Sequence, residues 1–83
     1  MKNFAILPFR AIKNGTVFRF EKQWFRRTVV GSIPCDSDGF YFEKNFNDRL
    51  ESKQDFSNST LVAVENIDWN VLDRNSIIEH IEV

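Results

Sequence analysis

Residues 16–28 constrain the fold of this chain more than any other stretch, because their pattern is that of a β-hairpin with two different faces. We expect Glu21 and Lys22 to form a two-residue turn between two short strands. This turn sets the register of the predicted hairpin: Val17 opposite Arg26, Phe18 opposite Phe25, Arg19 opposite Trp24, and Phe20 opposite Gln23. Because side chains alternate across a strand, each strand then has one apolar side and one largely polar side.

The two faces of the hairpin predict different roles. One face favours a position in the core because it collects three phenylalanines: Phe18, Phe20 and Phe25. The other face is a candidate contact surface, and it carries Val17, Arg19, Trp24, Arg26 and Thr28. Tryptophan, tyrosine and arginine are the residues that interface hot spots favour. The predicted partner-binding residues are therefore Arg19, Trp24, Arg26, Lys22, Arg27 and Tyr41.

The length and composition predict one small globular domain over residues 1–83. Nine Phe, two Trp and one Tyr are many for 83 residues. Each buried aromatic removes about 150–250 Å² from water, so a few of them supply most of a small core. The one cysteine, Cys35, excludes an intramolecular disulfide and favours a reducing compartment. With no stretch as long as a membrane span, we expect a cytoplasmic protein with no membrane partner.

The overall pattern predicts a mainly β (α+β) fold. We expect a small bent antiparallel sheet, or a partly open SH3-like barrel, of four to five strands with a short C-terminal helix. Residues 3–12 predict an edge strand or extended arm, because Pro8 cannot donate to a ladder. Further strands are expected at residues 40–43 and 61–64. The expected core is Phe18, Phe20, Phe25, Val29, Phe40, Phe42, Leu61, Val62 or Ala63, and Ile78.

The connecting segments carry turn and helix signals. Turns are expected at residues 13–15 and 36–39, and the second hairpin strand runs on to Gly31 before residues 32–34 break it. Residues 44–60 predict a long polar loop with a helical turn around residues 46–50. Asn75 or Ser76 would cap the C-terminal helix, although the β-branched isoleucines that follow leave a strand as the alternative.

Charge divides unevenly along the chain. Residues 1–34 hold seven basic residues and one acid, a net charge of +6, whereas residues 35–83 hold four basic residues and eleven acids, a net charge of −7. This division predicts either a basic face and an acidic face or two halves that interleave and neutralise each other.

Motifs for chemistry are absent. His80 and Cys35 show no pattern of a catalytic pair, and the three glycines are too scattered for a phosphate loop. With Gly39 at the sixth position of a calcium loop, Pro34 and Asn45 occupy the first and twelfth positions, where neither residue fits. We therefore expect no enzyme, no cofactor and no metal, and an Asx-type turn at Asp36.

Two functions fit these features. The first is a non-enzymatic binding module that docks on a larger cytoplasmic protein and modulates or inhibits it, a protein that handles nucleic acid being one candidate partner. Charge polarity steers such an encounter, and the hairpin edge is also compatible with a homodimer. The alternative is direct binding of single-stranded nucleic acid or RNA through Arg19, Trp24 and Arg26, since such proteins combine basic grooves with aromatic stacking platforms.

The segments 15–20 and 24–28, Gly-Thr-Val-Phe-Arg-Phe and Trp-Phe-Arg-Arg-Thr, resemble the opening hairpin of small β-barrel proteins encoded by bacteriophages. Residues 61–64 look like the closing strand of those proteins, so the resemblance covers about half of the chain. It departs at the turn, where Glu21 and Lys22 replace the usual Asn-Gly. The resemblance implies a barrel fold and a viral or prophage setting in the host cytoplasm, with a host or viral protein as partner, and it supplies no active site.

Overall fold

The computed structural model describes residues 3–65, 67 and 74–82. The elements in chain order are β1 (Asn3–Pro8), η1 (Phe9–Ala11), β2 (Val17–Phe20), β3 (Gln23–Thr28), β4 (Gly31–Pro34), α1 (Phe46–Ser52), β5 (Leu61–Glu65), η2 (Arg74–Ser76) and β6 (Glu79–Glu82). The strands in these residues form one antiparallel six-stranded sheet of order β4-β3-β2-β5-β1-β6. The mainly β class is confirmed, with six strands in place of four to five.

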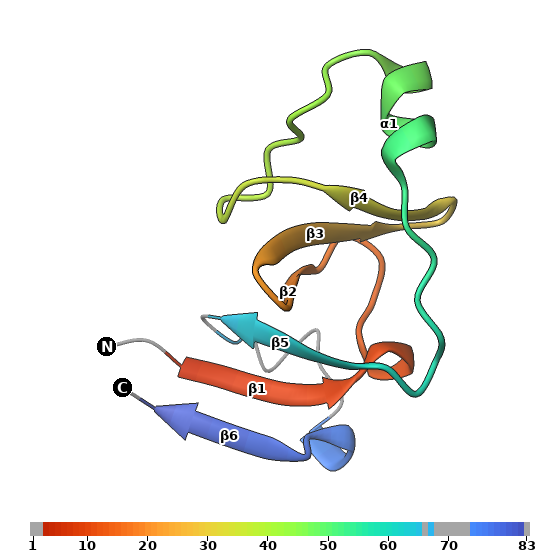
Figure 1. The fold of residues 1–83 in the computed structure, drawn as a ribbon. Helices are drawn as coiled ribbons and strands as arrows, with labels where there is room; N and C mark the ends of the chain where they lie inside the picture. Colours follow the sequence, from red (N-terminus) through yellow and green to blue (C-terminus); the bar gives the residue numbers. More distant parts are fainter. Residues whose placement is uncertain (1–2, 66, 68–73, 83) are drawn as a thin grey trace.

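The sheet consists of two three-stranded halves joined between β2 and β5 (Figure 1). Only one residue pair, Arg19 with Ala63, is in ladder register at this junction. In Figure 1 β4, β3 and β2 lie above β5, β1 and β6, and α1 lies above β4. Strands β2, β3 and β4 come from the basic residues 1–34 and are neighbours in the sheet. β1 comes from the same basic part of the chain but lies between β5 and β6, which come from the acidic residues 35–83. The basic and acidic parts of the chain therefore interleave only in part.

The predicted hairpin is confirmed in its register. Val17 pairs with Arg26, Phe18 with Phe25, Arg19 with Trp24, and Phe20 with Gln23. The turn residue Glu21 has φ +57°, so it adopts the left-handed conformation that two-residue hairpin turns require. The turn before the hairpin is also confirmed, because the Thr16 amide donates to the Lys13 carbonyl over 3.1 Å.

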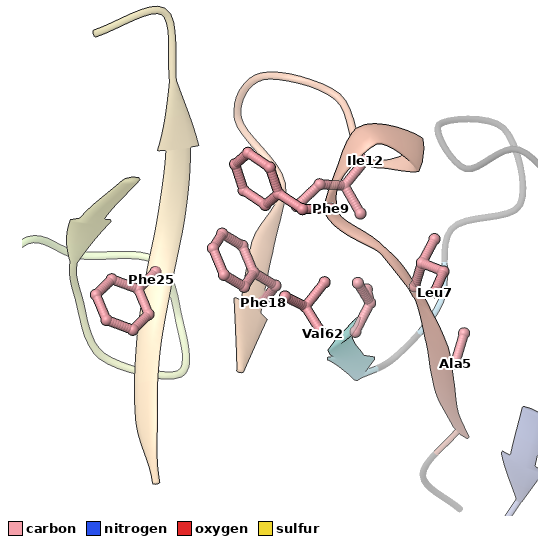
Figure 2. Close-up of a cluster of buried hydrophobic side chains, with 8 residues drawn as sticks. Ala5, Leu7, Phe9, Ile12, Phe18, Phe25 and Val62 are labelled. Atoms are coloured by element: carbon pink, nitrogen blue, oxygen red, sulfur yellow. The ribbon is translucent and has the colours of Figure 1, made fainter. Parts of the chain in front are cut away.

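The core lies on the face that Phe18 and Phe25 share, as predicted. Alternate residues of β1 and β5 contribute to the same core, where Ala5 pairs with Val64 and Leu7 pairs with Val62. Figure 2 draws eight buried side chains as one group, which come from β1, β2, β3 and β5 and from residues 9–12 that follow β1. The buried cluster is Ala5, Leu7, Phe9, Ile12, Phe18, Phe25, Val62 and Val64.

Phe56 completes the core from a segment that the sequence predicts as a polar loop. Its ring lies 5.0–5.6 Å, centroid to centroid, from four other rings: Phe9, Phe18, Phe20 and Phe25. The chain reaches this position after α1, where residues 53–60 run from the top of the molecule down to β5 (Figure 1). The amide of Gln54 donates to the Ser32 carbonyl over 2.8 Å on the way, so the segment is tied to β4.

Several predicted core residues are wrong, and each has a local cause. Val29 is 86% exposed because the chain reverses at residues 29–30, after which residues 31–34 form β4 instead of a break. Phe40 and Phe42 are 73% and 60% exposed because residues 40–43 form no strand; only Tyr41 makes an isolated bridge, with Cys35. Leu61 is 48% exposed because the alternation of β5 turns Val62 and Val64 inward.

The predictions for the two ends of the chain are also wrong. β1 is not an edge strand, since it pairs with β5 on one side and β6 on the other. Pro8 is tolerated because it is the last residue of β1. The C-terminal helix is wrong and the alternative, a strand, is confirmed: residues 79–82 form β6, which pairs with β1, and Ile78 before it is 62% exposed. The helical turn around residues 46–50 is confirmed as α1, capped by the Asn45 side chain.

Candidate interaction surface

The outer face of the hairpin presents a stacked arginine and tryptophan. The Arg19 guanidinium lies over the Trp24 ring, 5.8 Å from its centroid, and its Nε donates to the Glu21 carbonyl over 3.1 Å. Arg19 is exposed and Trp24 is half-buried. The structure therefore brings these two predicted site residues together, in the register that the sequence predicts.

Tyr41 lies between two arginines on the same side of the sheet. The guanidinium carbons of Arg26 and Arg49 lie 5.9 and 4.6 Å from the centroid of its ring. Arg49 is fixed in turn, because its Nε donates to the Glu43 carbonyl over 2.6 Å. Arg49 is absent from the predicted site residues. The sequence predicts the helical turn that contains Arg49, but it does not indicate which part of the sheet this turn packs against.

Residues 36–41 fold back over part of the predicted contact face. Asp36 Oδ1 accepts from the amides of Asp38 and Phe40 over 2.9 and 3.0 Å, which is the predicted Asx-type turn. Gly39 is buried with φ +90°, and a Cβ placed on it would lie 2.9 Å from Cγ2 of Val17. The Val17 end of the hairpin is therefore covered by the chain itself, and the Arg19–Trp24 end remains open.

The last two predicted site residues lie apart from this face. Lys22 is exposed in the hairpin turn. Arg27 shares the core side with Phe25, since the two residues are two positions apart on β3. Its Nη1 donates to the carbonyls of Phe9 and Ile12 over 2.7 and 2.6 Å, and its guanidinium lies 4.3 Å from the Phe9 ring centroid. The contacts of Arg27 are thus with the interior of the fold.

Among the described residues, the most exposed aromatic side chains are ones that the sequence assigned to the core or to the helical turn around residues 46–50. Phe40, Phe42 and Phe46 are 73%, 60% and 62% exposed. We call residues 40–46 the aromatic loop. Its signal in the sequence was ambiguous, because alternating Phe-Tyr-Phe is equally the pattern of a half-buried strand.

The surroundings of the aromatic loop are acidic. Residues 36–52 hold five acids and two basic residues, a net charge of −3. These are Asp36, Asp38, Glu43, Asp48 and Glu51 against Lys44 and Arg49. A net negative charge on this segment disfavours a polyanion and favours a basic surface.

Cys35 lies beneath this surface as an inert thiol. It is fully buried, and burial, followed by the nearby Asp36 carboxylate, raises its pKa to about 11 against the opposing charge of Arg26. Because the thiolate is the nucleophile, a raised pKa lowers reactivity at neutral pH.

We expect alkylation of native Cys35 by iodoacetamide at pH 8 to be about 100-fold slower than in the unfolded chain. The reason is that each unit by which the pKa rises lowers the thiolate fraction about tenfold. The rate should rise with pH up to the region of the folded pKa, near 11. Mass spectrometry of quenched samples measures it. Equal rates with and without denaturant would contradict the buried position of this thiol.

Comparison with protein-family models, curated proteins and solved structures finds no match for this chain. The resemblance to phage-encoded barrels therefore stays a prediction, and the surface described above has to be interpreted from its own chemistry. Within the described residues, no helix combines the length and the apolar character that a membrane crossing requires.

Proposed function

We propose that this protein is a non-enzymatic binding module that docks on a larger cytoplasmic protein through the aromatic loop and modulates that protein. The observation that carries the proposal is the exposure of Phe40, Phe42 and Phe46, each at least 60% open to solvent within seven residues. Exposed apolar groups gathered in one place are typical of protein-interaction sites. Tyr41 adds a ring held in place by Arg26 and Arg49, so part of the surface is ordered before binding.

The charge of the surface indicates the kind of partner. Exposed rings on a segment of net negative charge fit an apolar cleft bordered by basic residues. Surfaces rich in lysine and arginine are the electrostatic signature of proteins that handle nucleic acid. The proposed partner is therefore a nucleic-acid-handling protein whose basic surface this module occupies, which is a direct physical route to inhibition.

Direct nucleic-acid binding is the second candidate, and one observation favours it. Arg19, Arg26 and Arg49 stack on aromatic rings, and none of them forms an ion pair within the described residues. Bases stack on such platforms. The net charge of −3 over residues 36–52 opposes this reading, because the segment that carries Tyr41 and Arg49 is negative as a whole.

The test is affinity capture from cell lysates with the tagged full chain and two variants. The double variant Phe40→Ala/Phe42→Ala removes two exposed rings, whereas Ile78→Ala removes an exposed apolar side chain outside the loop and serves as the matched control. We expect one dominant protein to be retained by the wild type and the control. Because a hot spot contributes about 2 kcal/mol, the double variant should lose at least about 30-fold in affinity for that protein.

Capture that is unchanged in the double variant, or no specific capture at all, would contradict the proposal. Titration with oligonucleotides tests the second candidate in parallel. Binding that weakens steeply with salt and is lost in Trp24→Ala would support direct nucleic-acid recognition in its place.

A further inference from the structure

One half of the sheet, formed by β5, β1 and β6 (Figure 1), carries apolar side chains on both faces. One face supplies the buried core, and the residues that alternate with the core residues point to the other side. Continuous apolar runs are typical of strands that are covered on both faces, whereas a strand with one face in water alternates apolar and polar residues. We call the second side the outer face, and it carries Phe4, Ile6, Leu61, Ala63 and Ile81.

Among the described residues, the segments that pack against the sheet leave the outer face open. Phe56, Ile67 and Ile77 pack against the core cluster, which lies on the opposite side. α1 packs against β4, at the far edge of the sheet. Leu61 and Ile81 are accordingly 48% and 39% exposed. The described part of the chain therefore does not supply the cover that the apolar character of this face predicts.

A row of four residues crosses the same side of the sheet from a basic end to an acidic end. Arg19 on β2 lies opposite Ala63 on β5, which lies opposite Ile6 on β1. Ile6 in turn lies opposite Glu79 on β6. Arg19 and Glu79 are exposed, and neither forms an ion pair within the described residues. Three strand spacings, about 14 Å, separate the two residues, so each charge is left for a partner outside the chain.

This row is complementary to itself. A two-fold rotation about an axis parallel to the strands, between β5 and β1, lays Ile6 over Ala63 of a second copy and Glu79 over its Arg19. Sheets that pack face to face are about 10 Å apart, which the side chains of arginine and glutamate span together. Rotation about an axis across the strands would instead lay Arg19 over Arg19. A closed dimer requires a surface that matches itself in this way, so the charges favour a second copy as the cover.

We propose that two copies of this chain form a two-fold dimer through their outer faces, with Arg19 of each copy paired with Glu79 of the other. The hairpin itself offers no open edge for a second copy, because β2 pairs with β5 and β3 pairs with β4. Arg19 remains stacked on Trp24 in the dimer: its Nε donates to the Glu21 carbonyl, and its Nη atoms donate to the partner carboxylate. Apolar residues form the centre of the interface, and the two ion pairs form its margins.

The test is sedimentation velocity of the full chain over a range of concentrations. We expect the mass to rise from that of a monomer to that of a dimer between about 1 µM and 1 mM, the range in which an interface with few polar contacts dissociates. Ala63→Lys places a charge at the apolar centre and should leave only monomer at every concentration. Val29→Lys adds the same side chain at a residue that is 86% exposed in the β3–β4 turn, and it should dimerise as the wild type does.

Charge reversal tests the proposed ion pairs separately from the fold. Arg19→Glu and Glu79→Arg each turn two attractions into two repulsions, and each should weaken the dimer by about tenfold. The double variant Arg19→Glu/Glu79→Arg restores opposite charges at both margins. Its dissociation constant should return to within about threefold of the wild-type value. A merely structural effect of either substitution would add up in the double variant and would not be reversed.

Four results would overturn the proposal: a monomer throughout the concentration range, a dimer that persists in Ala63→Lys, a dimer that is lost in Val29→Lys, or a double variant no tighter than its single variants. The aromatic loop is the competing surface for self-association. Loss of the dimer in Phe40→Ala/Phe42→Ala would therefore also contradict the outer face as the interface. Capture of a partner by Ala63→Lys should equal that of the wild type, so the dimer and the proposed docking function fail or hold independently.

Discussion

Replacing Phe56 by alanine is expected to lower the free energy of unfolding by about 3–4 kcal/mol, within the range of Phe→Ala changes in protein cores. The reason is that Phe56 lies against four other rings, with centroid separations of 5.0–5.6 Å. Removing it opens a void between Phe9, Phe18, Phe20 and Phe25, which belong to three different elements and cannot close over the gap without moving the strands. Urea unfolding followed by tryptophan fluorescence measures the change.

Phe42→Ala is the matched control for this prediction. The chemical change is identical, but the Phe42 ring is 60% exposed, so we expect a change within about 0.5 kcal/mol. Similar losses in the two variants would show that position 56 has no special place in the core. Because a domain of 83 residues has a stability at the lower end of the usual range, Phe56→Ala should also be partly unfolded at 37 °C.

The hairpin could be predicted from the sequence because its information is local. A two-residue turn and a period of two fix the register of residues 17–26, and the same rule selects Phe18 and Phe25 for the core. β5 follows from its apolar run, and α1 from the polar segment that Asn45 caps. Each of these features depends on neighbours within about ten residues of sequence.

The rest could not be predicted because it depends on contacts between distant segments. Phe56 stands in a polar stretch, and only the path of residues 53–60 from α1 to β5 brings it into the core (Figure 1). The local sequence left helix and strand open for the last residues, and pairing with β1 decides in favour of the strand β6. Only part of the candidate surface could be predicted. The Arg19–Trp24 pair follows from the register of the hairpin, whereas Arg49 reaches Tyr41 only through tertiary packing.

Replacing Arg27 by methionine is expected to cost about 2–3 kcal/mol of stability, although arginine is among the residues most often found on the surface. Its Nη1 donates to two carbonyls, that of Phe9 at the start of η1 and that of Ile12 directly after η1. Methionine keeps most of the apolar stem but leaves both carbonyls without this donor, and a lost partner costs more than a hydrogen bond adds. Thermal unfolding followed by circular dichroism should show a clear loss in melting temperature.

Arg26→Met tests whether this loss reflects the contacts of Arg27 or merely the removal of one positive charge. Arg26 is the preceding residue on β3 and faces the other side of the sheet. Its side chain donates no hydrogen bond within the described residues, and its guanidinium lies 5.9 Å from the Tyr41 ring centroid. We expect this variant to lose less than about 1 kcal/mol, the value of a partly exposed cation–π contact. Equal losses in the two variants would assign the effect to charge, whereas the expected difference identifies Arg27 as the residue that fastens η1 to the sheet.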